Sequence, residues 1–188
     1  MSEHEDWVST GLPGLDHVLH GLRAGDNVVS QVESIAEYQP FVEAYVQEVL
    51  KAGKTLTYFR FARHPELVRK MDGIEIIRLN PEMGFESFLM EILDVVERRG
   101  LGADYLFDCL SDLAVDWYSD QMLANFFMIT CPFLYRLDTI AYFAILRNRH
   151  ISRTVESITN TAQVVIDVFC NRSQLYVQPL KVWQRYSP

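Results

Sequence analysis

The fold is decided by STGLPGLD at residues 9–16 and GLRAGD at residues 21–26, which lead into the apolar run NVVSQV at residues 27–32. A short apolar run after glycine turns predicts a buried strand. The next segment, ESIAEYQP at residues 33–40, contains neither glycine nor lysine. A phosphate-binding loop needs glycines, so that backbone N–H groups can turn toward phosphate oxygens, and a lysine that reaches them. We therefore expect no triphosphate cradle after this strand.

Strand and helix patterns alternate along the rest of the chain. We expect strands at residues 54–61, 74–79, 105–110 and 140–146, and helices at residues 41–51, 64–71, 85–99 and 118–135. The continuous apolar run at residues 140–146 is typical of a parallel strand that is covered on both faces. This alternation predicts an α/β fold with a mostly parallel sheet and helices on both faces.

The end of the chain has a different pattern. Residues 164–170 and 174–182 flank Asn171-Arg172-Ser173, which predicts a C-terminal antiparallel β-hairpin added to the sheet. Pro179 cannot donate a backbone hydrogen bond, so it indicates an edge strand or a bulge. We expect one domain over residues 1–188. Because no helix or tail follows the hairpin, this domain could be cut from a longer polypeptide or could end naturally.

Composition excludes several classes of protein. Of the 188 residues, 49% are hydrophobic and 22% are charged, which is typical of a globular protein. The formal net charge of −8 argues against a nucleic-acid partner, because phosphate contacts need a concentrated positive field. The longest apolar stretch, residues 121–135, is too short to span a bilayer. Cys109, Cys131 and Cys170 are widely spaced, so we expect reduced core thiols in a cytoplasmic protein.

Several of these motifs resemble those of RecA/KaiC-like ATPase domains. The two glycine turns resemble the family's approach to its first core strand, and YLFDCLSDL at residues 105–113 resembles its Walker B segment. The resemblance implies a RecA-like sheet, with Asp108 in the place of the aspartate that positions Mg²⁺. In the family a Gly-Lys-Thr/Ser loop would occupy residues 33–40, and paired glutamates would follow the second strand. Both are absent, so we expect no ATP hydrolysis by the family mechanism.

The acidic residues near these motifs have two interpretations each. Glu33 and Glu37 either begin an ordinary helix or keep anions away from its positive N-terminal end. Asp108, Asp112 and Asp116 recur every fourth residue and could suggest a metal site. They also suit a strand end and helix caps, and without phosphates one or two carboxylates bind Mg²⁺ poorly. We expect neither a metal nor a cofactor.

Two basic clusters each follow an apolar strand. Their members are Arg60, Arg63 and His64 in the first cluster and Arg147, Arg149 and His150 in the second. Both should emerge at the carboxyl edge of the parallel sheet, where open α/β folds bind ligands. One interpretation is a site for a phosphate, a nucleotide or a partner's carboxylate, because arginine binds such groups in a bidentate manner. The other is that the clusters pair with acidic residues of the same edge, namely Asp108, Asp112, Glu33 and Glu37.

The leading hypothesis is a non-catalytic regulatory or interaction module derived from a RecA/KaiC-like ATPase. The resemblance further suggests attachment to an enzyme similar to phosphoenolpyruvate synthase or pyruvate, phosphate dikinase. The alternative is a domain that binds a nucleotide or phosphorylated metabolite through the basic clusters. We expect a protein partner, other domains of the same chain or a homo-oligomer, with a dimer favoured over a hexamer, and neither nucleic acid nor membrane as a partner.

Overall fold

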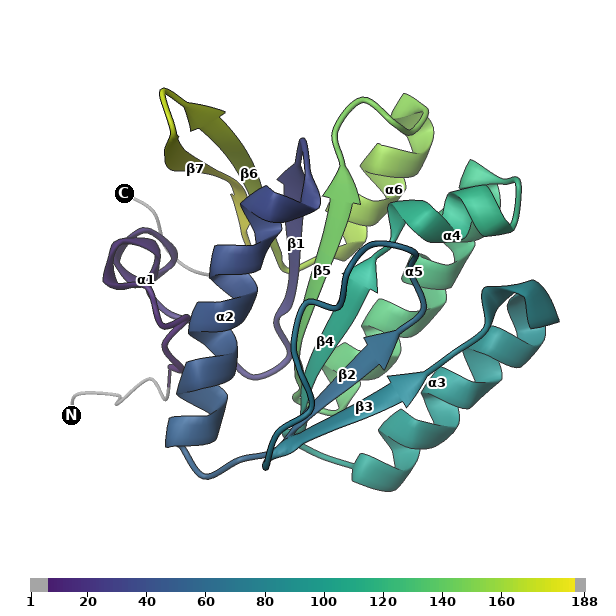
Figure 1. Cartoon of the computed structure of the whole chain (residues 1–188), viewed down its shortest axis with the longest axis horizontal. Helices are drawn as coiled ribbons and strands as arrows, with labels where there is room; N and C mark the ends of the chain where they lie inside the picture. Colours follow the sequence, from purple (N-terminus) through teal and green to yellow (C-terminus); the bar gives the residue numbers. More distant parts are fainter. Residues whose placement is uncertain (1–6, 185–188) are drawn as a thin grey trace.

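A single seven-stranded sheet organises the protein, which is described over residues 7–184 by a computed structural model (Figure 1). The strand order is β3-β2-β4-β5-β1-β6-β7. In chain order the strands are β1 (Asn27–Val32), β2 (Leu56–Arg60), β3 (Ile74–Arg78), β4 (Asp104–Cys109), β5 (Ile140–Leu146), β6 (Val164–Asn171) and β7 (Gln174–Val182). Neighbouring strands pair in parallel except β6 and β7, which form an antiparallel hairpin. The predicted fold class is confirmed, although β6 itself runs parallel to β1, so only β7 reverses direction.

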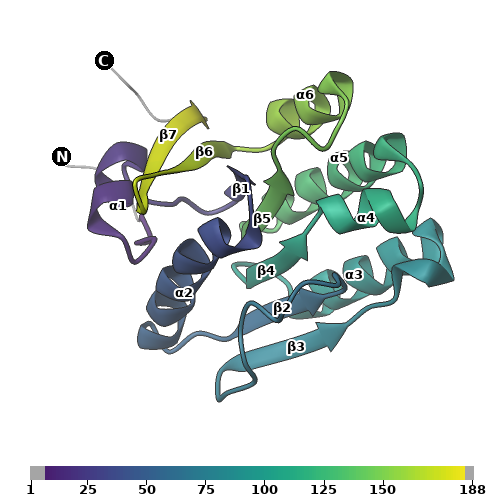
Figure 2. The same cartoon turned by 45° about the horizontal axis from the view of Figure 1, so that its top comes forward.

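Helices cover both faces of this sheet, as predicted (Figures 1 and 2). They are α1 (Pro13–Leu19), α2 (Ile35–Lys51), α3 (Phe85–Arg99), α4 (Ser111–Asp116), α5 (Asp120–Arg136) and α6 (Ser152–Thr161), with a short 3-10 helix at Pro81–Met83. The first two pack on one face, and α3, α5 and α6 pack on the other. No helix within residues 7–184 is long and apolar enough to cross a membrane.

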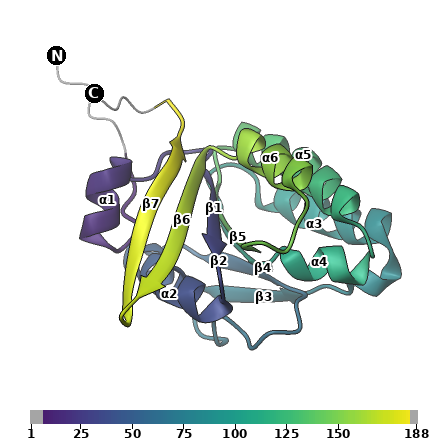
Figure 3. The ribbon, with the colours of Figure 1, turned by 90° about the horizontal axis from the view of Figure 1, so that it is seen from above.

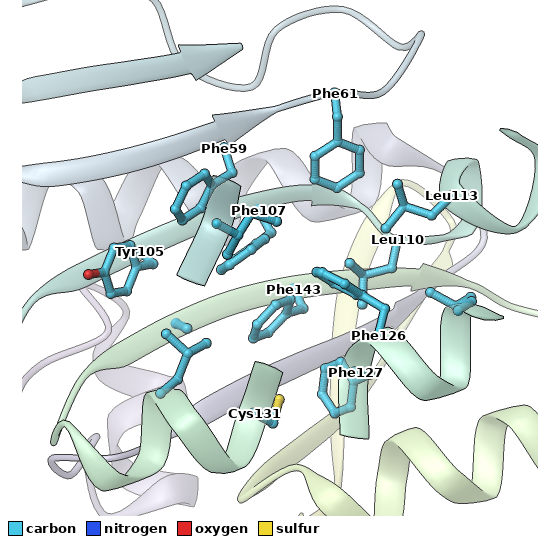
Figure 4. Packing of buried hydrophobic residues seen from close by; sticks show 14 of the residues in the cluster. Phe59, Phe61, Tyr105, Phe107, Leu110, Leu113, Phe126, Phe127, Cys131 and Phe143 are labelled. Atoms are coloured by element: carbon cyan, nitrogen blue, oxygen red, sulfur yellow. The ribbon is translucent and has the colours of Figure 1, made fainter. Parts of the chain in front are cut away.

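Aromatic packing fills the layer between the sheet and α3 and α5 (Figure 4). Phe107 on β4 stacks on Phe143 of β5 with ring centroids 4.4 Å apart. Phe59 of the neighbouring strand lies 4.8 Å from Phe107, and Phe127 of α5 meets Phe143 edge-on at 5.2 Å. All six residues of β4 are buried, because the strand is central and covered on both faces.

Helix α2 begins at Ile35 rather than at residue 41 as predicted. Pro40 therefore lies inside the helix, where it cannot donate to the carbonyl four residues earlier. The first turn is held by other contacts, since Tyr38 is fully buried and the Glu37 carboxylate accepts the Glu33 N–H at 2.7 Å. Packing and this side-chain contact outweigh the helix-breaking tendency of proline.

The helix predicted at residues 64–71 is wrong, because this segment is a series of bends. Leu67 and Val68 are buried against the same face as α2. The Leu67 carbonyl accepts from Gln39 Nε2 at 2.7 Å, and its N–H donates to the Tyr58 hydroxyl at 3.2 Å. The backbone groups that a helix would pair with one another are bonded to side chains of α2 and β2 instead.

Two further helices differ from the sequence expectation. Helix α6 had not been predicted in the connection between β5 and β6. The helix expected at residues 118–135 is α5. A turn in which Tyr118 has φ of 50° separates α5 from the preceding helix α4. Ser119 caps α5 through a 3.1 Å hydrogen bond from the Met122 N–H to its hydroxyl.

The pairing of the β6–β7 hairpin accounts for the position of Pro179 and for the exposure of Cys170. Pro179 lies opposite Ile166 on the edge strand, and Leu180 is the extra residue of a bulge, as the proline predicted. Cys109 and Cys131 are buried free thiols, but Cys170 is exposed, so its predicted core position is wrong. The reason is that β1 pairs with β6 only as far as Asp167, and the end of β6 pairs with β7 alone.

The stacked aromatic layer predicts a large stability loss on truncation. Phe107→Ala should lower the free energy of unfolding by about 3–5 kcal/mol, because a fully buried ring is replaced by a cavity. Urea denaturation followed by circular dichroism measures the change. Met83→Ala is the matched control, since Met83 is 67% exposed and should leave stability unchanged. Equal effects of the two substitutions would contradict the assigned core.

Candidate functional site

The carboxyl edge of the sheet carries both basic clusters, as the sequence predicted. Arg60 is the last residue of β2, and residues 147–150 follow β5. Strand β4 lies between these two strands, and α4 leaves its end after Leu110 (Figure 2). Helix α4 is therefore placed between the clusters, and its side chains contact both.

Asp108, at the end of β4, is fully buried and surrounded by donors. Arg60 Nη1 lies 2.6 Å from Asp108 Oδ2, and the Tyr58 hydroxyl donates to Oδ1. The backbone N–H groups of Phe61 and Ala62 donate to Oδ2 at 2.7 and 2.8 Å. These contacts occupy the carboxylate that the resemblance assigned to Mg²⁺ positioning.

Asp108 shifts the pKa values of its two side-chain donors, Arg60 and Tyr58. Burial alone would lower the pKa of Arg60, but its hydrogen bond and charge interaction with Asp108 raise that pKa above its usual value. Burial, followed by the Asp108 charge, raises the pKa of Tyr58. Arg60 therefore stays charged and Tyr58 stays neutral, so both remain donors to the carboxylate at neutral pH.

The other members of the first cluster are also paired. The Arg63 N–H donates to Asp112 at 2.9 Å, and its guanidinium lies 2.8 Å from Asp116. His64 Nε2 accepts the Cys109 N–H at 3.2 Å, so its Nδ1, 2.7 Å from the carbonyl oxygen of Pro65, is the protonated nitrogen. This cluster is held by the chain's own groups, with Asp108, Asp112 and Asp116 as partners.

Glu33 and Glu37, the other predicted partners, follow β1 at the same edge of the sheet, but their hydrogen bond is with each other. Their mutual contact is at the N-terminus of α2, where the Glu37 carboxylate is buried. A carboxylate in this place accepts a hydrogen bond from a backbone N–H group. Its negative charge also interacts favourably with the positive end of the helix dipole, as a bound anion would. The three aspartates do not form a metal site either: within residues 7–184 no group of three or more His, Cys, Asp or Glu side chains is placed to hold a metal ion.

The second cluster is split among three environments. Arg147 lies 2.7 Å from Asp167 on β6 and also donates to the Val168 carbonyl at 2.5 Å. His150 is enclosed, with Nε2 2.7 Å from Ser111 Oγ and Nδ1 2.8 Å from Asp120 Oδ1. Arg149 is exposed and makes no hydrogen bond or ion pair among the described residues. Of the six predicted basic residues, it is the one without a hydrogen bond or ion pair to residues 7–184.

A surface hollow of about 430 Å³ opens beside Arg149. Its lining includes Ser111, Leu146 and His150, together with residues of α4. Ser111 and Asp120 were not among the predicted site residues. Both contact His150, although Ser111 is 39 positions and Asp120 is 30 positions away from it in the sequence. No local sequence pattern indicates such a pairing.

No protein-family model matches this sequence, and no curated protein matches it. The assignment of function therefore depends on the geometry of these groups.

The donors around Asp108 predict the cost of removing it. Asp108→Ala should lower the free energy of unfolding by about 3–5 kcal/mol, because the partly buried Arg60 guanidinium and the buried N–H groups of Phe61 and Ala62 lose their acceptor. Chemical denaturation measures the change. Glu66→Ala is the control, since it breaks the exposed pair with Arg78 and should cost about 0–1 kcal/mol. A small effect of Asp108→Ala would show that the buried pair is not a structural tie.

Proposed function

We propose that this protein is a regulatory or interaction module related to RecA/KaiC-like ATPases that does not hydrolyse ATP. Support comes from the two places where the family chemistry would act. The Glu37 carboxylate lies at the helix N-terminus that a phosphate would use. The Asp108 carboxylate, which would position Mg²⁺ in the family, is paired with the Arg60 guanidinium. A nucleotide would have to displace both internal contacts before it could bind in the family manner.

The observation that carries the interaction role is the exposed apolar surface of the edge strand β7. Leu175, Tyr176 and Leu180 are 38%, 43% and 51% exposed. The strand has one charged residue, Lys181, and its Nζ donates to the carbonyls of Thr159 and Asn160 at 3.1 and 2.7 Å. Edge strands of monomeric proteins are usually protected by charges, proline or bulges. Strand β7 has Pro179 and a bulge, but its one charged side chain is bonded within the chain, so residues 174–178 favour pairing with another strand.

An apolar hollow extends this surface toward α1. It has a volume of about 520 Å³ and is bordered by α1, the start of α2 and residues of β7, including Val18, Phe41 and Val177. Figure 3 shows α1 beside the hairpin at this edge of the sheet. Side chains of an added strand would therefore find an apolar cavity next to the backbone groups with which the strand pairs.

The occupant that we propose is a second copy of this chain. Two β7 strands can pair antiparallel about a twofold axis, which presents the same surface on both sides. Each chain carries a net charge of −8, so copies repel over most of their surface. Strand β7 has no acidic residue, so this edge allows approach without bringing carboxylates together.

The cellular setting is a separate proposal based on the sequence resemblance. We place the module in the cytoplasm, attached to an enzyme similar to phosphoenolpyruvate synthase or pyruvate, phosphate dikinase. The two buried free thiols are compatible with a reducing compartment.

Dimerisation through β7 predicts a specific response to charge. Leu180→Lys should convert a dimer to a monomer, because each chain would place an ammonium group in the proposed apolar interface. Sedimentation equilibrium over a concentration series measures the state. Met90→Lys, at a 55% exposed position on α3, is the matched control and should leave the dimer intact. A monomeric wild-type protein, or a dimer that is unaffected by Leu180→Lys, would overturn this proposal.

The second candidate function is anion binding, which Arg149 favours because it makes no hydrogen bond or ion pair within residues 7–184. A ligand at one hundred times its dissociation constant stabilises the folded state by about 2.7 kcal/mol, which a thermal melt detects. With ATP and magnesium, ADP, phosphoenolpyruvate or phosphate, we expect no shift of the melting temperature, because five of the six predicted basic residues are already paired. A shift that disappears in Arg149→Ala would establish the anion site instead.

A further inference from the structure

Ser111, His150 and Asp120 form a continuous hydrogen-bonded chain at the carboxyl edge of the sheet. Ser111 Oγ lies 2.7 Å from His150 Nε2, and His150 Nδ1 lies 2.8 Å from Asp120 Oδ1. The three residues come from α4, the loop after β5 and the start of α5. We propose that they are a serine nucleophile, its general base and the carboxylate that orients the base, and that they transfer short acyl groups from neutral esters.

The hydrogen bonds fix the direction of each proton. The Leu146 N–H donates to Ser111 Oγ at 2.8 Å, so the serine's own proton is directed to His150 Nε2. The Asp120 carboxylate can only accept, so His150 carries its proton on Nδ1 and presents a basic Nε2 to the serine. This is the arrangement in which histidine can remove the proton of a serine hydroxyl.

Asp120 is held in the ionised state that this role requires. Burial would raise its pKa, but hydrogen bonds from His150 and from the Ile151 N–H lower it below the usual value. The Ile151 N–H lies 2.7 Å from the second carboxylate oxygen, which fixes the orientation of the group. Asp120 thus stabilises the imidazolium that forms when His150 takes a proton.

The hollow beside the triad limits what can react. Ser111 is 4% exposed and the His150 side chain 2% exposed, and both line this hollow of about 430 Å³, through which a substrate would reach them. Val115 and Leu146 give it apolar walls that suit a short acyl chain. The charged groups around His150 are Asp120, Asp112 on α4 and Arg149, and two carboxylates disfavour an anionic substrate.

The reaction has two balanced steps. Ser111 Oγ bonds to the ester carbonyl carbon while its proton moves to His150 Nε2. Arg149 lines the same hollow, and in this proposal it is the cation that stabilises the negative charge on the carbonyl oxygen. The imidazolium then gives this proton to the departing alkoxide as the ester carbon–oxygen bond breaks. Water, deprotonated by His150, hydrolyses the acyl-serine and restores the free hydroxyl.

A small dialkyl fluorophosphate tests the nucleophile directly. In the folded wild-type protein, Ser111 Oγ should displace fluoride and form a stable phosphoester, while its proton passes through His150 to solvent. Intact-mass measurement detects the adduct, and peptide mapping should place it on Ser111. No adduct, or an adduct on another residue, would overturn the proposal without any variant.

Variants separate the role of each group. Ser111→Ala should abolish labelling, and His150→Gln should slow it about a hundredfold or more, because the general base is lost. Arg149→Gln should slow hydrolysis of a short-chain p-nitrophenyl ester about tenfold. Ser157→Ala on α6 is the matched control and should label as the wild type does. Thermal melts confirm that each variant is folded, and undiminished labelling of folded His150→Gln would refute the mechanism. These measurements do not involve β7, so their outcome is independent of dimerisation.

Discussion

The buried carboxylate of Asp108 is the interaction on which the carboxyl edge of the sheet depends. It joins β4 to the end of β2 through Arg60, and it fixes the backbone that follows through the N–H groups of Phe61 and Ala62. Because these donors converge on one group, the loop after β2 has little freedom to rearrange. The oxygens of this carboxylate are therefore occupied by donors of the chain itself, and its role in this structure is to tie β4 to β2.

Much of the fold could be predicted because its signals are local. Continuous apolar runs located the parallel strands, and Pro179 indicated the edge and bulge of β7. The helix predicted near Pro65 failed because Leu67 and its neighbours bond to side chains of α2 and β2, which no local pattern contains. Helix α6 was missed because few of its residues are apolar, with Thr154 and Ile158 buried.

The candidate sites divide in the same way. Sequence placed both basic clusters at the correct edge, since each follows a strand. It could not assign their partners, because each contact depends on how the sheet orders its strands: β4 brings Asp108 beside Arg60, and β6 brings Asp167 beside Arg147. Ser111 had been interpreted as part of a Walker B-like segment. Its contact with His150 exists only because β4 and β5 are neighbours.

Helix α4 has a consequence of its own. Its first two residues contact opposite clusters: Ser111 bonds to His150, and Asp112 accepts the Arg63 N–H. Adjacent residues of a single helical turn cannot move separately by much. A displacement that begins at one cluster would therefore tilt this turn of α4 and change the hydrogen bond at the other cluster. The two clusters are mechanically coupled through α4. Their amide groups would then exchange with solvent as one cooperative unit.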